Sequence, residues 1–263
     1  MKKKLNVKLI IKRNEKKFRS KGRSINYLYF PCLNKKKRKG LIISFGAWPG
    51  PQYNRIRDYY ENERKEYDLL YLEDGFGYKH QGVFYLAEKG DFSIEEIYAK
   101  LINKIIKKSK VPKEKVYCLG SSMGGFAALY FAYKLNLGKV VAIGPLIKLR
   151  KLYQKSKGHK KLYKFIINDS KFNLDKLILK KFDKKVDTEV HIIYQHNDDL
   201  TIKGGISDLL KILIKNENKF SVESFDIKTS KNISNHIIIS YITDRIKIMK
   251  EFNEKLTINY PPK

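Results

Sequence analysis

Short apolar runs alternate with amphipathic segments along most of this chain. The runs at 41–46, 68–73, 115–119, 139–144 and 189–194 are continuous instead of alternating with polar residues. Strands that are buried on both faces of a parallel sheet have this composition. A last strand is predicted near 219–226. Two earlier segments, 4–12 and 25–31, are predicted to form an antiparallel pair of strands at the edge of the sheet.

Helical periodicity fills the intervals between these strands. Ser93 and the acidic residues after it are typical of a helix start, and apolar residues then recur every four positions, at Ile97, Leu101 and Ile105. We therefore predict a helix from Ser93 to about Lys108. Two more are predicted, from Gly125 to about Tyr133 and over about 237–255.

The alternation of strands and helices predicts an α/β fold, with a mostly parallel central sheet flanked by helices. The segment 146–187 is rich in lysine, helical in pattern and without a clear strand. It falls between two strands of the sheet, so we expect a small helical cap inserted there. The prediction is one domain over 1–263, with edge strands in 1–38.

Composition limits the classes of function. The 263 residues carry a net charge of +29, but the lysines are scattered in clusters and no nucleic-acid-binding motif accompanies them. We expect no specific nucleic-acid partner, although such a charge is compatible with peripheral contact to an anionic membrane or polysaccharide. No signal-peptide core or membrane-spanning run is present, so we expect a cytoplasmic protein, compatible with a place at the inner membrane face. The sequence does not indicate the oligomeric state.

The most informative motif is Gly120-Ser121-Ser122-Met123-Gly124, which has the form G-x-S-x-G. It follows an apolar strand and precedes a helix rich in small residues. A sharp strand-to-helix turn of this kind projects its central serine above the sheet, where it can act as a nucleophile. A glycine-rich turn that binds phosphate or only packs tightly is the alternative. Ser121 is a competing hydroxyl, but it does not hold the central position.

These residues resemble the α/β-hydrolase superfamily, and the resemblance covers roughly residues 40–255. Within the superfamily, the string from Leu70 to Leu86 and the Gly-Ser-Ser-x-Gly-Gly turn resemble a narrower bacterial group. That group comprises capsular-polysaccharide biosynthesis proteins and the glycan-acetylating component of the accessory Sec system. The resemblance implies an ester-processing enzyme that uses a catalytic triad.

The superfamily places its triad in the order serine, acid, histidine. Asp198 follows the strand at 189–194, and His236 follows the last strand, so Ser122, Asp198 and His236 match that order. The histidine would take the proton of the serine hydroxyl, and the carboxylate would fix the tautomer of the imidazole. Asp198 is preferred from its distance past the strand. The neighbouring Asp199 stays open as the acid.

An oxyanion hole is expected from two backbone N–H groups, those of Met123 and Ala47. The His-Gly pair that is common in this family is absent before Ala47, where Phe45-Gly46 stands instead. Three further residues are candidates for the pocket: Trp48, which fits the core equally well, Asp74, which fits a simple turn, and His196, which lies near the acid. Nothing in the sequence indicates a metal or another cofactor.

The sequence therefore predicts a serine esterase or O-acyltransferase that acts through an acyl-enzyme. Its expected substrate is a small-molecule or glycan ester, and the narrower resemblance points to O-acyl groups of a surface glycan. Two alternatives stay open. One is a non-catalytic scaffolding or binding member of an assembly that makes surface polysaccharide or exports glycoprotein. The other is a thioesterase or lipase, which needs a long apolar tunnel.

Overall fold

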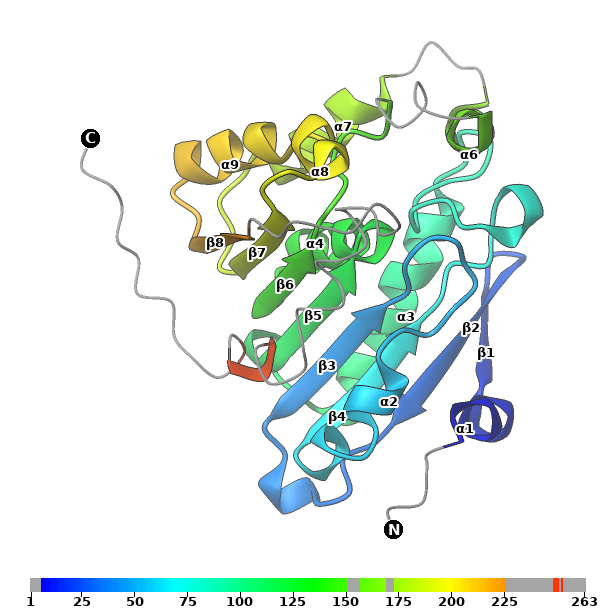
Figure 1. The fold of residues 1–263 in the computed structure, drawn as a ribbon. Coiled ribbons are helices and arrows are strands. Elements are labelled where there is room, and N and C mark those ends of the chain that lie inside the picture. Colours follow the sequence, from blue (N-terminus) through cyan, green and yellow to red (C-terminus); the bar gives the residue numbers. More distant parts are fainter. Residues whose placement is uncertain (1–5, 151–156, 169–172, 226–247, 251, 253–263) are drawn as a thin grey trace.

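The apolar runs form the central strands of one eight-stranded sheet in the computed structural model (Figure 1). The structure describes residues 6–150, 157–168, 173–225, 248–250 and 252. The strands are β1 (Lys16–Ser20), β2 (Arg23–Phe30), β3 (Gly40–Phe45), β4 (Tyr67–Leu72), β5 (Val116–Ser121), β6 (Lys139–Ile143), β7 (Glu189–Gln195) and β8 (Phe220–Phe225).

The helices cover both faces of the sheet and one end of it. They are α1 (Val7–Asn14), α2 (Ile56–Tyr59), α3 (Ser93–Ser109), α4 (Met123–Leu135), α6 (Lys157–Ile167), α7 (Leu174–Phe182), α8 (Asp199–Lys203) and α9 (Ile206–Lys215). Four single turns of 3-10 helix are η1 (Lys35–Lys37), η2 (Glu63–Lys65), η3 (Tyr78–His80) and η4 (Lys113–Lys115).

The strand order is β1-β2-β4-β3-β5-β6-β7-β8. Strands β3 to β8 all pair in parallel, whereas β1 and β2 pair antiparallel with their neighbours. The fold is therefore α/β with a mostly parallel sheet, as predicted. Parallel strands end at the same edge of a sheet, so the segments that follow β3, β4, β5 and β7 meet along one edge.

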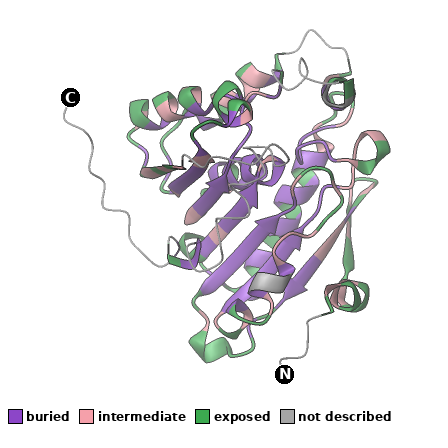
Figure 2. Cartoon of the chain, in the orientation of Figure 1, coloured by how far each residue is buried: buried purple, intermediate pink, exposed green. Residues whose placement is uncertain are grey.

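Each face of the sheet has its own apolar core, and Figure 2 shows the central strands buried between them. One core contains residues of α3, α4, α7 and α9. The other contains residues of α1 and α2 together with Ile248, Met249 and Phe252. Helix α4 is buried from Met123 to Tyr133, which explains why its sequence is apolar all round. It contacts β3, β5 and β6 and is the central helix of the fold.

The predicted strand at 4–12 is wrong, because α1 occupies this segment. Asn6 accepts a hydrogen bond from the N–H of Leu9 and caps the helix. Val7, Ile10 and Ile11 have helical spacing and pack on the second core. The antiparallel edge pair does exist, but the partner of β2 is the largely polar β1.

Apart from the predicted helix at 237–255, the other predicted elements lie within a few residues of their positions. Helix α3 begins at Ser93, but its cap position is Phe92; the N–H and hydroxyl of Ser93 contact the carboxylate of Asp91 instead. The predicted helix at 237–255 lies mostly outside the described residues.

The segment 146–187 holds α6 and α7 in its described parts, and no strand. Helix α7 contacts α4 and α9, whereas α6 contacts η3. The carbonyl groups of Phe165 and Ile166 at the end of α6 accept hydrogen bonds from Lys89 and Gly90. Helix α6 thus covers the segment that connects β4 to α3. Within the described residues, we find no helix with the length and apolar character that a bilayer crossing needs.

One buried carboxylate links α3 to α4. Glu95 is 6% exposed, and it accepts hydrogen bonds from the hydroxyl of Tyr130 and the ammonium of Lys134, both at 2.6 Å. We expect Glu95→Ala to lower the free energy of unfolding by about 2 kcal/mol, because it leaves the Tyr130 hydroxyl buried without an acceptor. Urea unfolding at pH 7 measures this change.

Glu96→Ala is the matched control. Glu96 pairs with Lys21 at the surface, where ion pairs contribute little. If both variants unfold at the same urea concentration, the hydrogen bonds between Glu95 and α4 do not contribute to stability.

Candidate active site

The turn between β5 and α4 holds Ser122 in a strained conformation. Its backbone has φ 54° and ψ −118°, a region that residues with a side chain rarely adopt. Such backbone strain costs on the order of 1–3 kcal/mol and concentrates at functional sites. The N–H of Ser122 donates to the carbonyl of Ile143 at the end of β6 over 2.8 Å. Ser122 is half-buried, whereas Ser121 and Met123 on either side are buried.

Two glycines make this turn possible. A Cβ atom on Gly120 would lie 2.0 Å from the carbonyl oxygen of Gly124. A Cβ atom on Gly124 would lie 2.5 Å from the carbonyl oxygen of Phe45 and 2.9 Å from that of Gly46. These separations are too short for any side chain, so the start of α4 lies directly against the end of β3.

This contact places the two predicted oxyanion donors on neighbouring segments. Met123 is the first residue of α4, and Ala47 comes two residues after the end of β3. Among the described residues, neither backbone N–H donates a hydrogen bond. The N–H of Gly46 is not available, because it donates to Leu72 over 2.9 Å. The N-terminus of a helix also carries a partial positive charge that favours an oxyanion.

A buried carboxylate supports the segment beside the turn. Asp74 is fully buried after β4, and its carboxylate accepts hydrogen bonds from the backbone N–H groups of Phe76, Val83 and Tyr85 at 3.4, 2.7 and 2.8 Å. Burial raises the pKa of Asp74 to about 6, although these three donors act in the opposite direction. Asp74 is one of the predicted pocket residues. In the structure its side chain lies inside the loop that follows β4, where these three N–H groups bind it.

The two candidate acids have different surroundings. Asp198 is 2% exposed; it accepts a hydrogen bond from the N–H of Leu200 and another from the Thr201 hydroxyl, and so caps α8. The side chain of Asp199 is 66% exposed and pairs with Lys203. Asp198 lies after β7, two strands from β5, which is about 10 Å along the sheet edge.

The remaining predicted residues are Trp48, His196 and His236. Trp48 is 36% exposed, which excludes a place in the core. His196 is exposed, and its backbone N–H donates to Phe225. His236 lies outside the described residues, so the serine, the acid and the histidine stay a predicted triad.

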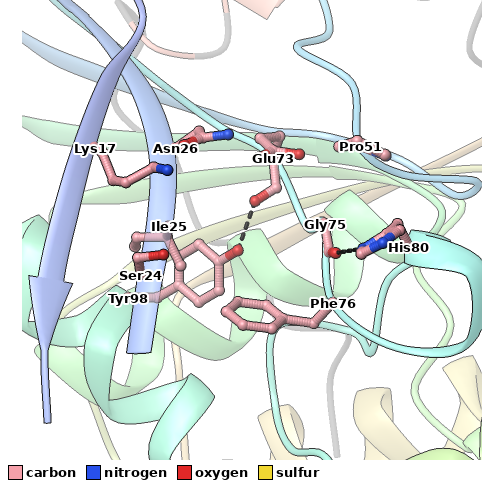
Figure 3. Close-up of a pocket in the computed structure, with 10 residues that line it drawn as sticks. All are labelled: Lys17, Ser24, Ile25, Asn26, Pro51, Glu73, Gly75, Phe76, His80 and Tyr98. Carbon is pink, nitrogen blue, oxygen red and sulfur yellow. Dashed lines mark hydrogen bonds between the residues drawn. The ribbon is translucent and has the colours of Figure 1, made fainter. Parts of the chain in front are cut away.

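The sequence reasoning missed Glu73, which lines a cavity of about 220 Å³ at the same sheet edge (Figure 3). Glu73 is 6% exposed, and its Oε2 has no hydrogen-bond partner among the described residues. Burial and the neighbouring Asp74 carboxylate raise the pKa of Glu73 to about 7. The sequence did contain a signal for Glu73, because a charged residue stands there at the carboxyl end of an apolar strand.

Comparison with known proteins supports the fold. No protein-family model matches the sequence, and no curated protein matches it. Among solved structures, the capsule O-acetyltransferase of Neisseria meningitidis serogroup A is similar with a TM-score of 0.69 at 20% identity, over 90% of this chain and 94% of that one. A Gap123 glycosylation-associated complex from Streptococcus agalactiae gives a TM-score of 0.69 at 16% identity, over 90% of this chain and 46% of that one.

A third similar structure is the serine hydrolase FphF of Staphylococcus aureus. Its TM-score is 0.62 at 15% identity, over 91% of this chain and 98% of that one. The strand order of the sheet and these similarities establish the α/β-hydrolase fold for this chain.

The raised pKa of Glu73 predicts a pH-dependent stability. Below pH 4.5 the carboxyl is protonated in both the folded and the unfolded chain. Between about pH 4.5 and 7 the unfolded chain ionises while the folded chain keeps its proton, so the free energy of unfolding falls as the pH rises. We expect the Glu73 part of this loss to reach up to about 3 kcal/mol at pH 8; Glu73→Gln should remove that part, while the loss due to the raised pKa of Asp74 remains.

Urea unfolding of both proteins at pH 4.5, 6 and 8 measures this difference. Glu66→Gln, which removes an exposed carboxylate paired with Lys39, is the control and should keep the pH dependence. A Glu73→Gln protein that loses stability with pH as steeply as the unmodified chain would contradict the assignment.

Proposed function

We propose that this chain is a serine-dependent ester hydrolase or O-acyltransferase, with Ser122 as nucleophile and O-acyl groups of a surface glycan as substrate. The observation that carries the proposal is the strained, half-buried Ser122 at the start of α4. The Ser122 hydroxyl does not cap the helix, although serine is a favoured capping residue. Strain at a serine in this position is typical of a nucleophile held out from the sheet edge.

The proposed reaction has two steps. The Ser122 Oγ attacks the ester carbonyl while His236 takes its proton, and Asp198 orients and stabilises the resulting imidazolium. The N–H groups of Met123 and Ala47 hold the negative oxygen of the tetrahedral intermediate. The protonated histidine then gives its proton to the leaving alcohol or thiol, and Ser122 is left acylated. Water or an acceptor hydroxyl next attacks the acyl group in the same way and releases Ser122.

The buried position of Asp198 supports its choice as the acid. A carboxylate that orients a histidine works best where water does not compete for it. Asp198 is 2% exposed and at the correct sheet edge, whereas Asp199 points into solvent and pairs with Lys203. The role of His236 rests on its place in the sequence alone.

The similar structures point toward acyl transfer to a glycan. One of them is a capsule O-acetyltransferase, and a variant of that enzyme has been solved in complex with CoA. Acetyl-CoA is therefore the first donor to test in a transfer assay. Another similar structure is a glycosylation-associated complex. A non-catalytic scaffolding role in such a complex is therefore the second candidate function for this chain.

A fluorophosphonate probe tests the nucleophile directly. We expect the probe to label the unmodified chain and not Ser122→Ala, because labelling requires an activated serine hydroxyl. Ser121→Ala is the matched control and should retain labelling, since Ser121 is 7% exposed and is the last residue of β5. In-gel detection and mass spectrometry of the labelled peptide give the readout. Absence of label on a folded, unmodified chain would favour the scaffolding role.

Paired substitutions test the acid. We expect Asp198→Asn to lower kcat/KM for p-nitrophenyl acetate by about 10³–10⁴-fold, because the amide fixes the wrong imidazole tautomer. The amide oxygen still serves to cap α8, which limits damage to the fold. Asp199→Asn should change kcat/KM less than about twofold. The reverse ranking would move the acid to Asp199, and faster cleavage of a long-chain ester than of the acetate would favour a lipase or thioesterase.

A further inference from the structure

A cavity at the same sheet edge as the predicted nucleophile is lined by four separate parts of the chain, namely β1 with β2, the loop after β3, the segment after β4, and α3. It opens between β1, β2 and the loops that follow β3 and β4 (Figure 3). Glu73 and Tyr98 lie buried at its inner end, whereas Lys17, Ser24 and His80 are exposed at its rim. The remaining lining residues are Ile25, Asn26, Pro51, Gly75 and Phe76.

Three polar side chains form a row across this cavity. Lys17 of β1 pairs with Asn26 of β2. Tyr27 pairs with Leu72 in the antiparallel ladder of β2 and β4, so the next position brings Asn26 opposite Glu73. Residues that lie opposite one another point to the same face of a sheet. Figure 3 shows Lys17, Asn26 and Glu73 in this order along one side of the cavity.

The Glu73 carboxylate lacks a partner that its burial requires. Buried carboxylates are normally paired or fully hydrogen-bonded, because burying an unpaired charge is costly. The side chain of Asn26 reaches Glu73, but Oε2 has no hydrogen-bond partner among the described residues. The hydroxyl of Tyr98 donates to the backbone carbonyl of Glu73 over 2.6 Å and so fixes the position of the residue. The unpartnered oxygen and the cavity together indicate a site for a ligand.

The lining determines the chemistry of this ligand. A small cation is disfavoured by Lys17 in the same row and by the net charge of +29. An anion is disfavoured by the buried Glu73. Hydroxyl groups fit, because each of them donates to a carboxylate and accepts from an amide or an ammonium. The rings of Phe76 and Tyr98 add an apolar surface. The cavity is smaller than the pockets that hold drug-sized ligands.

We propose that this cavity binds one sugar ring of a glycan, with hydroxyl groups of the ring donating to Glu73. The location connects the cavity to the predicted chemistry. Glu73 follows β4, which lies two strands from β5, so Glu73 is about 10 Å from the end of β5 along the sheet edge, and the cavity extends from Glu73 toward β2 and β1. Pro51 belongs to the same loop as Ala47, the predicted oxyanion donor. The role of the bound ring as part of the acyl acceptor rests on the proposed function, whereas ring binding itself does not.

Saturation-transfer NMR on the full chain tests ring binding. The probes are glucose, galactose and mannose with their N-acetylated 2-amino counterparts, each as the methyl glycoside. We expect saturation of the ring protons of at least one probe, and about tenfold weaker binding of that probe to Glu73→Ala, because a hydrogen bond to the carboxyl group is lost. Asn26→Ala should weaken binding at least threefold. Glu66→Ala, which removes an exposed carboxylate, should bind as the unmodified chain does.

Several outcomes would overturn the proposal. They are no saturation of any probe, binding by the Glu73→Ala and Asn26→Ala variants that equals binding by the unmodified chain, and displacement of the probe by millimolar Ca²⁺, which would indicate a cation site. Thermal melting identifies a variant that has not folded, and Glu73→Gln, which keeps the shape of the side chain, then replaces Glu73→Ala.

Fluorophosphonate labelling of the same unmodified sample separates the two proposals. If the chain is labelled at Ser122 but binds no sugar ring, only the proposed sugar site is wrong. If the chain binds rings through Glu73 but is not labelled, the sugar site stands and the proposed enzymatic function is wrong.

Discussion

The contact between the start of α4 and the end of β3 is the constraint on which the rest of the candidate site depends. Gly124 lies against the carbonyl groups of Phe45 and Gly46, at separations that leave no room for a Cβ atom. Because α4 approaches so closely, the chain must turn sharply after β5, and Ser122 takes a positive φ. The same approach brings the first N–H of α4 next to the segment that contains Ala47. One packing contact thus sets both the exposure of the hydroxyl and the place where a negative charge is stabilised.

The loops around this contact are held by buried polar groups instead of apolar packing alone. The carboxylate of Asp74 satisfies backbone N–H groups of Val83 and Tyr85, and the Tyr85 hydroxyl contacts the carbonyls of Gly46 and Leu72. The side chain of Met123 reaches the same loop, since a Cβ atom on Gly82 would lie 2.9 Å from its sulfur. A fully satisfied buried network of this kind rigidifies a site. The ends of β3, β4 and β5 therefore form one rigid unit, which is what preorganised hydrogen-bond donors require.

Much of this arrangement could be predicted from the sequence, and the failures have physical causes. Continuous apolar runs identify β3 to β7 because both faces of these strands are buried. The edge gives no such signal, because β1 has Phe18 as its only apolar residue and depends on pairing with β2. The α1 segment was mistaken for a strand because it is rich in β-branched apolar residues, namely Val7, Ile10 and Ile11. Glu73 was missed because its environment is created by Asn26 and Tyr98, which are distant in the sequence. The burial that separates Asp198 from Asp199 is likewise a tertiary property, and His236 lies outside the described residues.

The position of the cavity bears on the choice between hydrolysis and transfer. An acyl-enzyme transfers its group to an acceptor only when the acceptor hydroxyl competes with water, which requires that the acceptor be held in place. The antiparallel strands β1 and β2 extend the sheet beyond β4 and supply one wall of the cavity, so this sheet edge carries a polar cavity in addition to the turn that holds Ser122. A ring held by Glu73 at about 10 Å would place the neighbouring ring of a chain near Ser122. A glycan esterase also binds the sugar that carries its ester, so a ring held by Glu73 fits both proposed reactions, and the exclusion of water from the acyl-enzyme is what separates transfer from hydrolysis.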